Sequence, residues 1–275
     1  MNETLSTAEG RSVLRMERRL AHPPEKVWRA LTEPAQLARW FPSSVRLELR
    51  VGGRIEFDFP PDSPGVITAL DPPRVFAFTW DRDVLHWEIR PIAEGSLLIL
   101  TQTFDDRYGA PSFAAGWHTC VAALDGALSG AGRPTETSGM DELLEDYTKA
   151  FELDQGVEEE TGVRFERQLS RPIPVVWATL GGDPAGERVP EGFAVAEFPP
   201  LSPAHAKAPH LLEYGTRGGR VRWELREGTG QGARLVLTHT CPPEDRATAL
   251  TTWRDHVERL AQRLLRTPGR SGGAT

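Results

Sequence analysis

Two arginines occupy strand positions that are unusual for a charged side chain. Arg18 shares the strand parity of the apolar residues in Leu14–Leu20, and Arg167 shares that of the apolar residues around it. A charged group on the apolar side of a strand must be paired or must reach water past the sheet edge. Either arginine could anchor the acidic head of a ligand. We favour structural ion pairs, because the arginine is present in both halves of the chain.

Histidines and aspartates offer further candidates for acid–base chemistry. His86 alternates with Leu85 and Trp87, which turns it to the polar side of an expected strand. His118 flanks Trp117 at the edge of an expected helix. For both we favour a structural position over general-base catalysis. Four aspartates lie in expected loops: Asp81, Asp83, Asp105 and Asp106. Because aspartate is common in turns, we favour turn formation over paired catalytic carboxylates or a cation site.

The motifs of common catalytic sites are absent from the sequence. It contains no Gly-x-Ser-x-Gly elbow, no His-Glu-x-x-His helix and no phosphate-binding loop. The glycine-rich segment Gly228–Gly232 lies between two expected strands, whereas a phosphate loop opens a helix, so we predict a hairpin turn. Cys120 and Cys241 fit neither a metal-ligand spacing nor a disulfide framework. We expect no catalytic residue, no metal site and no cofactor.

Aromatic side chains in the first half could instead wall a ligand cavity. The candidate binding residues are Trp40, Phe41, Phe57, Phe59, Phe78, Trp80, Trp87, Trp117, Val121 and Arg18. Taken singly, a buried aromatic residue is more often part of a core than of a pocket. The sequence leaves open whether these rings pack on one another or face a ligand.

The elements that must position these side chains follow from hydrophobic periodicity. Leu14–Leu20 alternates as a strand, Pro23-Pro24 begins a helix, and a second short helix follows Pro34. Alternating segments on either side of Gly52-Gly53 predict a hairpin. Further strands are expected at Val66–Leu70, Val75–Trp80, Leu85–Arg90 and Leu97–Phe104, followed by a helix whose apolar side runs from Phe113 to Leu128. This order predicts an α+β fold in which one long helix covers a bent antiparallel sheet, with a cavity where the two do not close.

Four sequence blocks of the first half recur in the same order in the second. Leu14–Trp28 matches Val163–Trp177 at an offset of 149, with seven of fifteen positions identical. The other blocks match at offsets of 136 or 137: His86–Arg90 with Arg222–Arg226, Leu98–Thr103 with Leu235–Thr240, and the last helix of each half around Trp117 and Trp253. Such order predicts an internal duplication. The second copy has lost 13 residues net where the first carries Trp40, Phe41 and the hairpin, so we expect little space for a ligand there.

The residues of the first copy resemble a known superfamily. The segments that carry the resemblance are Ala21–Trp28, Leu31–Pro34, Leu37–Phe41, Val51–Arg54 and Phe76–Trp80. They are similar to the SRPBCC (START-like) superfamily, and within it to bacterial relatives of activators of the 90-kDa heat-shock-protein ATPase. The resemblance covers residues 12–130 and implies a helix-grip fold with a cavity. It implies no single activity, because the superfamily includes carriers, hormone binders, cyclases and co-chaperone modules.

Two tandem helix-grip domains are therefore expected. Residues 1–156 would form the first domain with a linker helix over Met140–Phe151, and residues 157–275 a shorter, degenerate second domain. The acidic residues between Glu152 and Glu160 suit a solvated linker better than an acidic docking tail.

Composition narrows the choice of function. Hydrophobic residues make up 39% and charged residues 26%, and no apolar segment is long enough to span a membrane, so we expect a soluble cytoplasmic protein. The net charge of −7 argues against nucleic acid as a partner. We expect a binding protein for a small hydrophobic or amphipathic ligand. The alternatives are a co-chaperone-like module that binds a protein, and a cyclase- or hydrolase-type enzyme.

Overall fold

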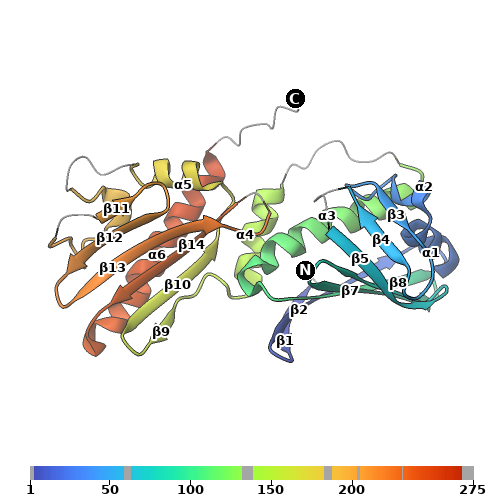
Figure 1. The fold of residues 1–275 in the computed structure, drawn as a ribbon, viewed down its shortest axis with the longest axis horizontal. Helices are drawn as coiled ribbons and strands as arrows, with labels where there is room; N and C mark the ends of the chain where they lie inside the picture. The colour runs from blue at the N-terminus through green and yellow to red at the C-terminus, as the bar shows by residue number, and fades with distance from the viewer. Residues whose placement is uncertain are drawn as a thin grey trace. The chain divides into compact units, whose positions relative to one another are not determined.

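The chain forms two α+β units, each built on an antiparallel sheet (Figure 1). The computed structural model describes residues 3–58, 63–131, 139–182, 188–202, 205–230 and 232–267. The units span Met1–Met140 and Asp141–Thr275. Among the described residues, no helix has the length and apolar character needed to cross a membrane.

The first unit is an eight-stranded sheet covered by a long helix. Its strands are β1 (Thr4–Ala8), β2 (Arg11–Leu20), β3 (Val45–Leu47), β4 (Arg54–Phe57), β5 (Ser63–Asp71), β6 (Val75–Trp80), β7 (Asp83–Ile92) and β8 (Gly95–Phe104), in the sheet order β1-β2-β8-β7-β6-β5-β4-β3. Its helices are α1 (Pro24–Thr32), α2 (Pro34–Leu37), the single 3₁₀ turn η1 (Arg107–Gly109) and α3 (Ala110–Leu128). Helix α3 runs across the sheet (Figure 1) and buries Trp117, Val121, Leu124 and Leu128 against it, as the helical spacing of these residues predicts.

Turn geometry explains two features of this sheet. β1, which sequence periodicity did not predict, joins β2 through Glu9 and Gly10, whose φ angles of 51° and 79° suit a two-residue hairpin. The turn between β3 and β4 needs both of its glycines. Gly52 has a φ of 77°, and a Cβ atom on Gly53 would lie 2.1 Å from the carbonyl oxygen of Glu48.

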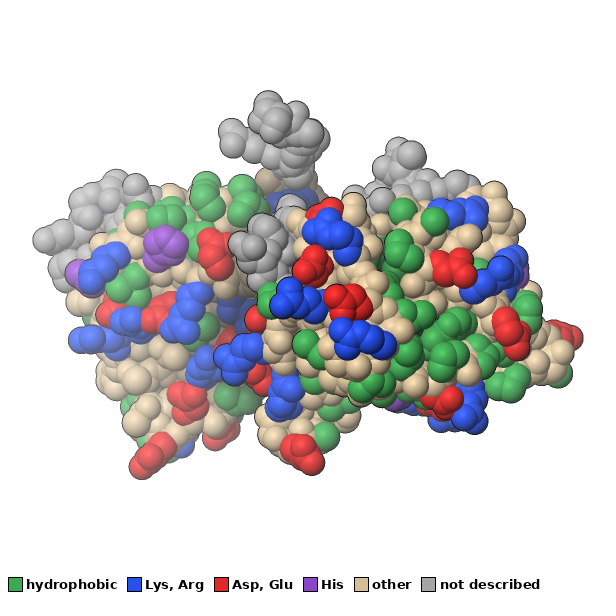
Figure 2. All heavy atoms as spheres, turned by 45° about the vertical axis from the view of Figure 1, so that its right-hand side comes forward, with side chains coloured by type: hydrophobic (Ala, Val, Ile, Leu, Met, Phe, Trp, Pro, Cys, Tyr) green, Lys and Arg blue, Asp and Glu red, His purple; other side chains and the backbone are tan. Residues whose placement is uncertain are grey.

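The same turn carries an apolar edge patch. Leu49, Val51 and Val66 are the exposed large hydrophobic side chains among the described residues of this unit. They lie on neighbouring backbone segments, because the amide of Gly52 donates to the carbonyl of Ile67 over 2.8 Å. Figure 2 shows that hydrophobic and charged side chains are interspersed over the face of the molecule turned to the viewer.

The second unit repeats the central part of this architecture with fewer strands. Its strands are β9 (Val157–Glu159), β10 (Gly162–Gln168), β11 (His205–Lys207), β12 (Leu211–Thr216), β13 (Gly219–Glu227) and β14 (Ala233–Thr240), in the order β11-β12-β13-β14-β10-β9. Its helical elements are α4 (Met140–Ala150), α5 (Ile173–Thr179), η2 (Glu191–Phe193), η3 (Pro243–Asp245) and α6 (Arg246–Arg266). β13 and β14 pair as an antiparallel hairpin, which confirms the turn expected at Gly228–Gly232.

Strand registers in the two units are the same where the sequence blocks recur. Arg15 pairs with Thr101 between β2 and β8, and Arg164 pairs with Thr238 between β10 and β14. The next strand along repeats the match, since Trp87 pairs with Leu100 and Trp223 with Leu237. A slip of one residue would turn every side chain of a strand to the other face of the sheet. Because the registers agree, equivalent side chains face the core in both units.

Helix α4 belongs to the second unit, whereas the sequence analysis grouped it with the first domain through residue 156. The division between the units lies at residues 140 and 141 instead. The reason is a set of buried contacts within the second unit. Glu145 and Thr148 on α4 bind the guanidinium of Arg167 on β10, and Leu144 and Tyr147 are buried.

Candidate functional site

The first unit contains an aromatic cluster between α2, the outer strands of the sheet and α3. We use this name for the rings of Trp40, Phe41, Phe57, Phe76, Phe78, Trp80, Trp87 and Trp117. All are buried except Trp80, which is half-buried. Seven of these rings were among the eight aromatic residues predicted to wall a cavity. The eighth predicted residue, Phe59, lies outside the described residues. Tertiary packing thus collects residues that are up to 77 positions apart in the chain (117 − 40).

Phe41 is the centre of this cluster. Its ring centroid lies 5.4 Å from that of Trp40, 5.8 Å from Phe57, 6.0 Å from Trp80 and 6.3 Å from Trp117. The Phe57 and Trp80 rings stack at 4.0 Å with an angle of 14° between their planes. Tilted and stacked ring pairs of this kind add to the stabilisation that burial alone provides.

A small apolar space remains inside the aromatic cluster. Its volume is about 20 Å³, and the residues lining it are Leu31, Leu37, Trp40, Phe41, Val45, Ile55, Phe57, Phe76, Phe78, Trp87 and Trp117. A space of this size holds about one water molecule. The rings therefore pack mainly on one another, and the cavity expected from the sequence is contracted to a remnant.

Short elements hold the outer wall of this space. α2 has four residues, and β3 is an edge strand that pairs only with β4, through three residues. Trp40 is fixed more firmly, because its indole N–H donates to the carbonyl oxygen of Ala30 on α1 over 2.9 Å. The wall made by α2 and β3 has few backbone hydrogen bonds, which is typical of segments that open locally at low cost.

A polar chain runs from the cluster through Gln102 on β8 to Asp83 at the start of β7. The indole N–H of Trp117 donates to Oε1 of Gln102 over 2.6 Å, and Nε2 of Gln102 donates to Asp83 over 2.7 Å. Burial raises the pKa of Asp83, and the Gln102 hydrogen bond opposes that rise. The chain contains only one titratable group, so it does not form a catalytic acid–base pair.

Trp80, Arg18 and Val121 do not line the space, although all three were candidate binding residues. The guanidinium of Arg18 forms an ion pair with Glu3, donates to the carbonyl oxygen of Glu17 over 2.8 Å, and lies 3.3 Å from Nδ1 of His118. This arrangement matches the structural ion pair that we favoured. Val121 is buried on α3 but is absent from the lining of the space.

The remaining candidates for chemistry occupy structural positions. His86 lies on the outward face of β7, between the buried Leu85 and Trp87. Asp105 accepts from Arg11 over 2.7 Å and forms an ion pair with Arg82 at 3.0 Å. Within the described part of the chain, no group of three or more histidine, cysteine, aspartate or glutamate side chains could hold a metal ion.

Several lining residues were missing from the predicted site, and strand parity could have identified some of them. Val45 and Ile55 share the parity of the predicted Phe57, and Phe76 shares that of the predicted Phe78. Leu31 and Leu37 belong to the apolar sides of α1 and α2. Their proximity to the rings depends on tertiary folding and has no sequence signal of its own.

The second unit fills the corresponding region with a different segment. Phe193 in η2 is fully buried, and its ring lies 5.0 Å from Trp177 and 5.5 Å from Trp223. Its carbonyl oxygen accepts from Tyr214 Oη over 2.8 Å and from Trp223 Nε1 over 3.0 Å. We call Phe193 and these contacts the plug; neither its buried ring nor its double hydrogen bond was foreseen from the sequence.

The covering helices of both units use equivalent tryptophan contacts. Trp117 and Trp87 meet edge to face at 5.4 Å, and Trp253 and Trp223 do so at 5.8 Å. The indole N–H of Trp253 donates to Nδ1 of His239 over 3.1 Å, and His239 occupies the repeat position of Gln102.

The Trp253 hydrogen bond fixes the tautomer of His239. Because Nδ1 accepts a hydrogen bond from the indole N–H, Nε2 of the neutral ring carries the hydrogen and donates to Thr216 Oγ1 over 3.3 Å. Burial lowers the pKa of His239 to about 4, so the ring is neutral near pH 7.

Arg167 differs from its counterpart Arg18 in being fully enclosed. It donates to Glu145 over 2.5 Å and to Glu258 over 2.9 Å, so α4 and α6 are both tied to β10. Burial disfavours the charge, yet the two carboxylates raise the pKa of Arg167 and keep it protonated. The role is structural, because all of these partners belong to the protein.

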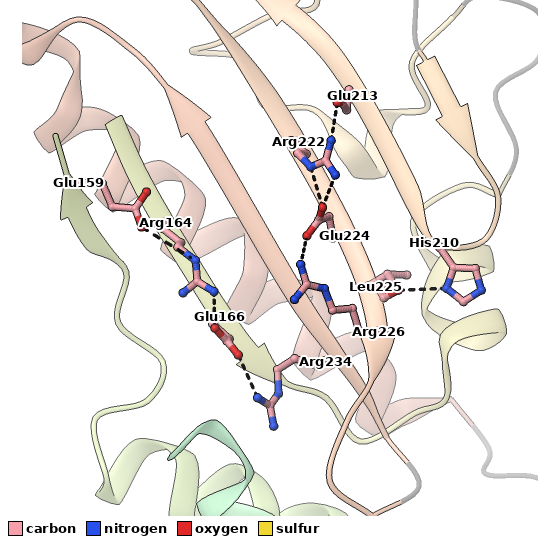
Figure 3. A network of polar contacts seen from close by, with 10 residues as sticks. All are labelled: Glu159, Arg164, Glu166, His210, Glu213, Arg222, Glu224, Leu225, Arg226 and Arg234. Carbon is pink, nitrogen blue, oxygen red and sulfur yellow. Dashed lines mark hydrogen bonds and ion pairs between the residues drawn. The ribbon is translucent and has the colours of Figure 1, made fainter. Parts of the chain in front are cut away.

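An ion-pair ladder covers the outward face of the second sheet (Figure 3). Arg222 on β13 binds Glu213 at 2.8 Å and also pairs with Glu224, which in turn pairs with Arg226. A second row joins Glu159, Arg164, Glu166 and Arg234. Positive and negative groups alternate along both rows, so this face carries no single-sign surface for nucleic acid.

Comparisons with known proteins bear on the first unit. Residues 21–129 match the family model described as activator of Hsp90 ATPase homolog 1-like protein. Among solved structures, a conserved protein of unknown function, EF2215 from Enterococcus faecalis, is 22% identical over 54% of this chain and 91% of its own, with a TM-score of 0.46. CalU16 from Micromonospora echinospora is 19% identical over 55% of this chain and 94% of its own, with a TM-score of 0.45. Comparison with curated proteins gives no match.

The family match agrees with the fold and with the residues that suggested it. It begins at Ala21, at the start of the first resembling segment, and ends at Ser129, just after α3. The matched region includes α1, α2, the meander from β3 to β8 and the covering helix. Residues 21–129 of this chain are therefore similar to an Aha-type helix-grip domain, as the model for activator of Hsp90 ATPase homolog 1-like proteins describes it.

Proposed function

We propose that the first domain binds a small hydrophobic or amphipathic molecule at the aromatic cluster. The observation that carries the proposal is the apolar space of about 20 Å³, which the rings line together with Leu37 of α2 and Val45 of β3. Aromatic walls with few polar groups are typical of small-molecule sites. The unliganded site is closed by its own rings, and a ligand replaces some of their contacts.

Entry of the ligand requires movement of Phe41 and of the wall around it. Phe41 follows α2, lines the space and touches four other rings, so its displacement enlarges the space and frees ring surface for a ligand. The three-residue pairing of β3 with β4 offers little resistance to this motion. The ring of Trp40 stays in place through its bond to Ala30 and forms the inner wall.

The second domain, we propose, is a degenerate copy of the first and has a supporting role. The equal strand registers and the repeated Trp–Trp contact support the common origin. The supporting role is suggested by Phe193, whose buried ring and doubly bonded carbonyl occupy the region where a ligand would lie. A ligand there would have to break two buried hydrogen bonds, which is costly.

Binding of a neutral apolar probe tests the first part of the proposal. N-phenyl-1-naphthylamine is titrated into the full chain and its fluorescence is recorded. We expect saturable binding that Trp80→Ala weakens, because the half-buried Trp80 ring stacks on Phe57, which lines the space. Tyr108→Ala, which removes a half-buried aromatic ring outside the cluster, is the matched control. Absence of saturable binding, or equal loss in both variants, overturns the proposal.

A protein partner is the second candidate function, and the apolar edge patch favours it. Leu49, Val51 and Val66 expose 44%, 60% and 44% of their surfaces, and grouped apolar exposure of this kind is typical of interaction sites. The family description names the partner to try first, the Hsp90 ATPase. We would measure ATP hydrolysis by Hsp90 with added protein. Stimulation that Leu49→Ser and Val51→Ser abolish would support this function over small-molecule binding, and a flat response would exclude it for this partner.

A further inference from the structure

A basic pocket shares Trp40 with the apolar space. Its volume is about 210 Å³, and it is lined by Lys26, Arg29, Ala30, Gln36, Arg39, Trp40, Ala127, Leu128 and Gly130. The lining comes from α1, α2 with the residues after it, and the C-terminal end of α3. None of these lining residues is acidic, whereas three are basic.

The three basic side chains differ in how far they are engaged. Nζ of Lys26 donates to the carbonyl oxygen of Leu128 over 2.6 Å, which satisfies the last turn of α3. Arg39 makes one hydrogen bond, to Oε1 of Gln36 over 3.3 Å. Arg29 makes no side-chain hydrogen bond or ion pair to the described part of the chain. Most of the guanidinium donors of Arg29 and Arg39 therefore remain for a ligand.

The pocket also has an apolar floor. Ala30, Ala127, Leu128 and the ring of Trp40 supply it, and all four side chains are buried. Trp40 lines this pocket and the space inside the aromatic cluster alike. A molecule whose charged end lies between Arg29 and Arg39 thus has its body directed against the indole that walls the apolar space.

We propose that the basic pocket binds the anionic head of an amphipathic ligand, a phosphate or carboxylate, whose apolar body lies against Trp40. Guanidinium groups form paired, charge-assisted hydrogen bonds with such anions. The inference rests on the proposed function and narrows it from apolar molecules in general to amphipathic anions. Glu25 of α1 and Glu33, which caps the C-terminal end of α1, do not line the pocket, so no carboxylate among its lining residues competes for the arginines.

Three probes distinguish the contribution of the anionic head to binding from that of the apolar body. Calorimetric titration of the full chain uses 1-naphthyl phosphate, the neutral 1-naphthol and inorganic phosphate. We expect 1-naphthyl phosphate to bind about tenfold or more tightly than 1-naphthol, since a hydrogen bond to a charged group contributes about 1.5–3 kcal/mol. Inorganic phosphate should bind more weakly than the ester, because it has no body to place against Trp40.

Paired substitutions then locate the anion. Arg29→Gln with Arg39→Gln should bring the two naphthyl probes to within about twofold of each other, because the donors of the head are gone. The control removes two positive charges at exposed turns that line neither space, with Arg50→Gln and Arg74→Gln. This control should keep the advantage of the ester. Circular dichroism verifies that both double variants are folded.

The outcomes are distinct. Three results overturn the basic-pocket proposal: the ester keeps its tighter binding in the Arg29/Arg39 variant, it loses that advantage equally in the control, or inorganic phosphate binds as tightly as the ester. In each case, binding of 1-naphthol still supports the proposed function. Failure of both naphthyl probes to bind overturns the two proposals together. An ester that depends on Arg29 and Arg39, alongside 1-naphthol that does not bind, supports the pocket and contradicts binding in the aromatic cluster.

Discussion

Replacing Phe41 by alanine removes the ring at the centre of the aromatic cluster. Phe41 exposes 6% of its surface and has four ring neighbours within 6.3 Å. Truncation of a buried phenylalanine costs about 3–5 kcal/mol, made up of lost transfer free energy and of the cavity left behind. The value should fall near the lower end, because the short α2 and β3 elements can settle into the space.

The same substitution should tighten the binding of a neutral aromatic probe. It enlarges the space of about 20 Å³ without the cost of displacing a ring. Urea denaturation, with hydrogen exchange of β7 and β8 peptides as the readout, measures the free energy of unfolding of the first domain alone. Fluorescence titration with N-phenyl-1-naphthylamine measures probe affinity.

Phe104→Ala is the matched control for both measurements. Phe104 exposes 1% of its surface and packs on Phe113 at 4.8 Å, outside the aromatic cluster. It should lose similar stability with no gain in probe affinity. The reasoning is refuted if Phe41→Ala costs less than about 1 kcal/mol, which would mean that the ring is not packed, or if both variants change probe affinity equally.

Three further outcomes are expected. Arg167→Ala should destabilise the second domain by about 3–5 kcal/mol, because it leaves Glu145 buried without its charge partner; the shift of the urea midpoint measures this loss. Burial depresses the pKa of His239 in the folded state to about 4, below the unfolded value near 6.5. The contribution of its neutral ring to the free energy of unfolding is therefore complete above pH 6.5, and at most about 3 kcal/mol of it is lost as the pH falls toward 4. His239→Gln, which copies Gln102, should flatten that pH dependence in calorimetric scans, and an unchanged slope would assign it to other groups. Phe193→Ala should lower the stability of the second domain by about 3–5 kcal/mol and open probe binding there; a probe affinity unchanged from the parent chain would contradict the plug.

Much of the first domain was predictable because its signals are local. The alternation in Leu14–Leu20, the prolines that begin α1 and α2, and the apolar side of α3 each depend on neighbours within a few residues. The internal repeat was equally visible in the sequence. The repeated segments have the same strand registers in the structure, because the same alternate side chains must face the core in both copies.

Other elements had no such signal. β1 is exposed over most of its length, so it lacks the apolar alternation that identifies a half-buried strand. Helix α4 was predicted from its spacing, but its membership of the second unit depends on the buried pair of Glu145 and Arg167. Glu145 and Arg167 lie 22 residues apart, and no local pattern in the sequence identifies them as partners.

The sequence by itself determined that aromatic residues of the first domain share one side of the sheet, since strand parity and helical spacing are set by covalent geometry. Only the tertiary structure decided what those residues do together. Packing around Phe41 contracts the space to about 20 Å³ and excludes Trp80, Val121 and Arg18 from its lining. Packing also leaves Arg29 and Arg39 unopposed beside Trp40, because ring separations and the location of charges depend on how α1, α2 and α3 meet.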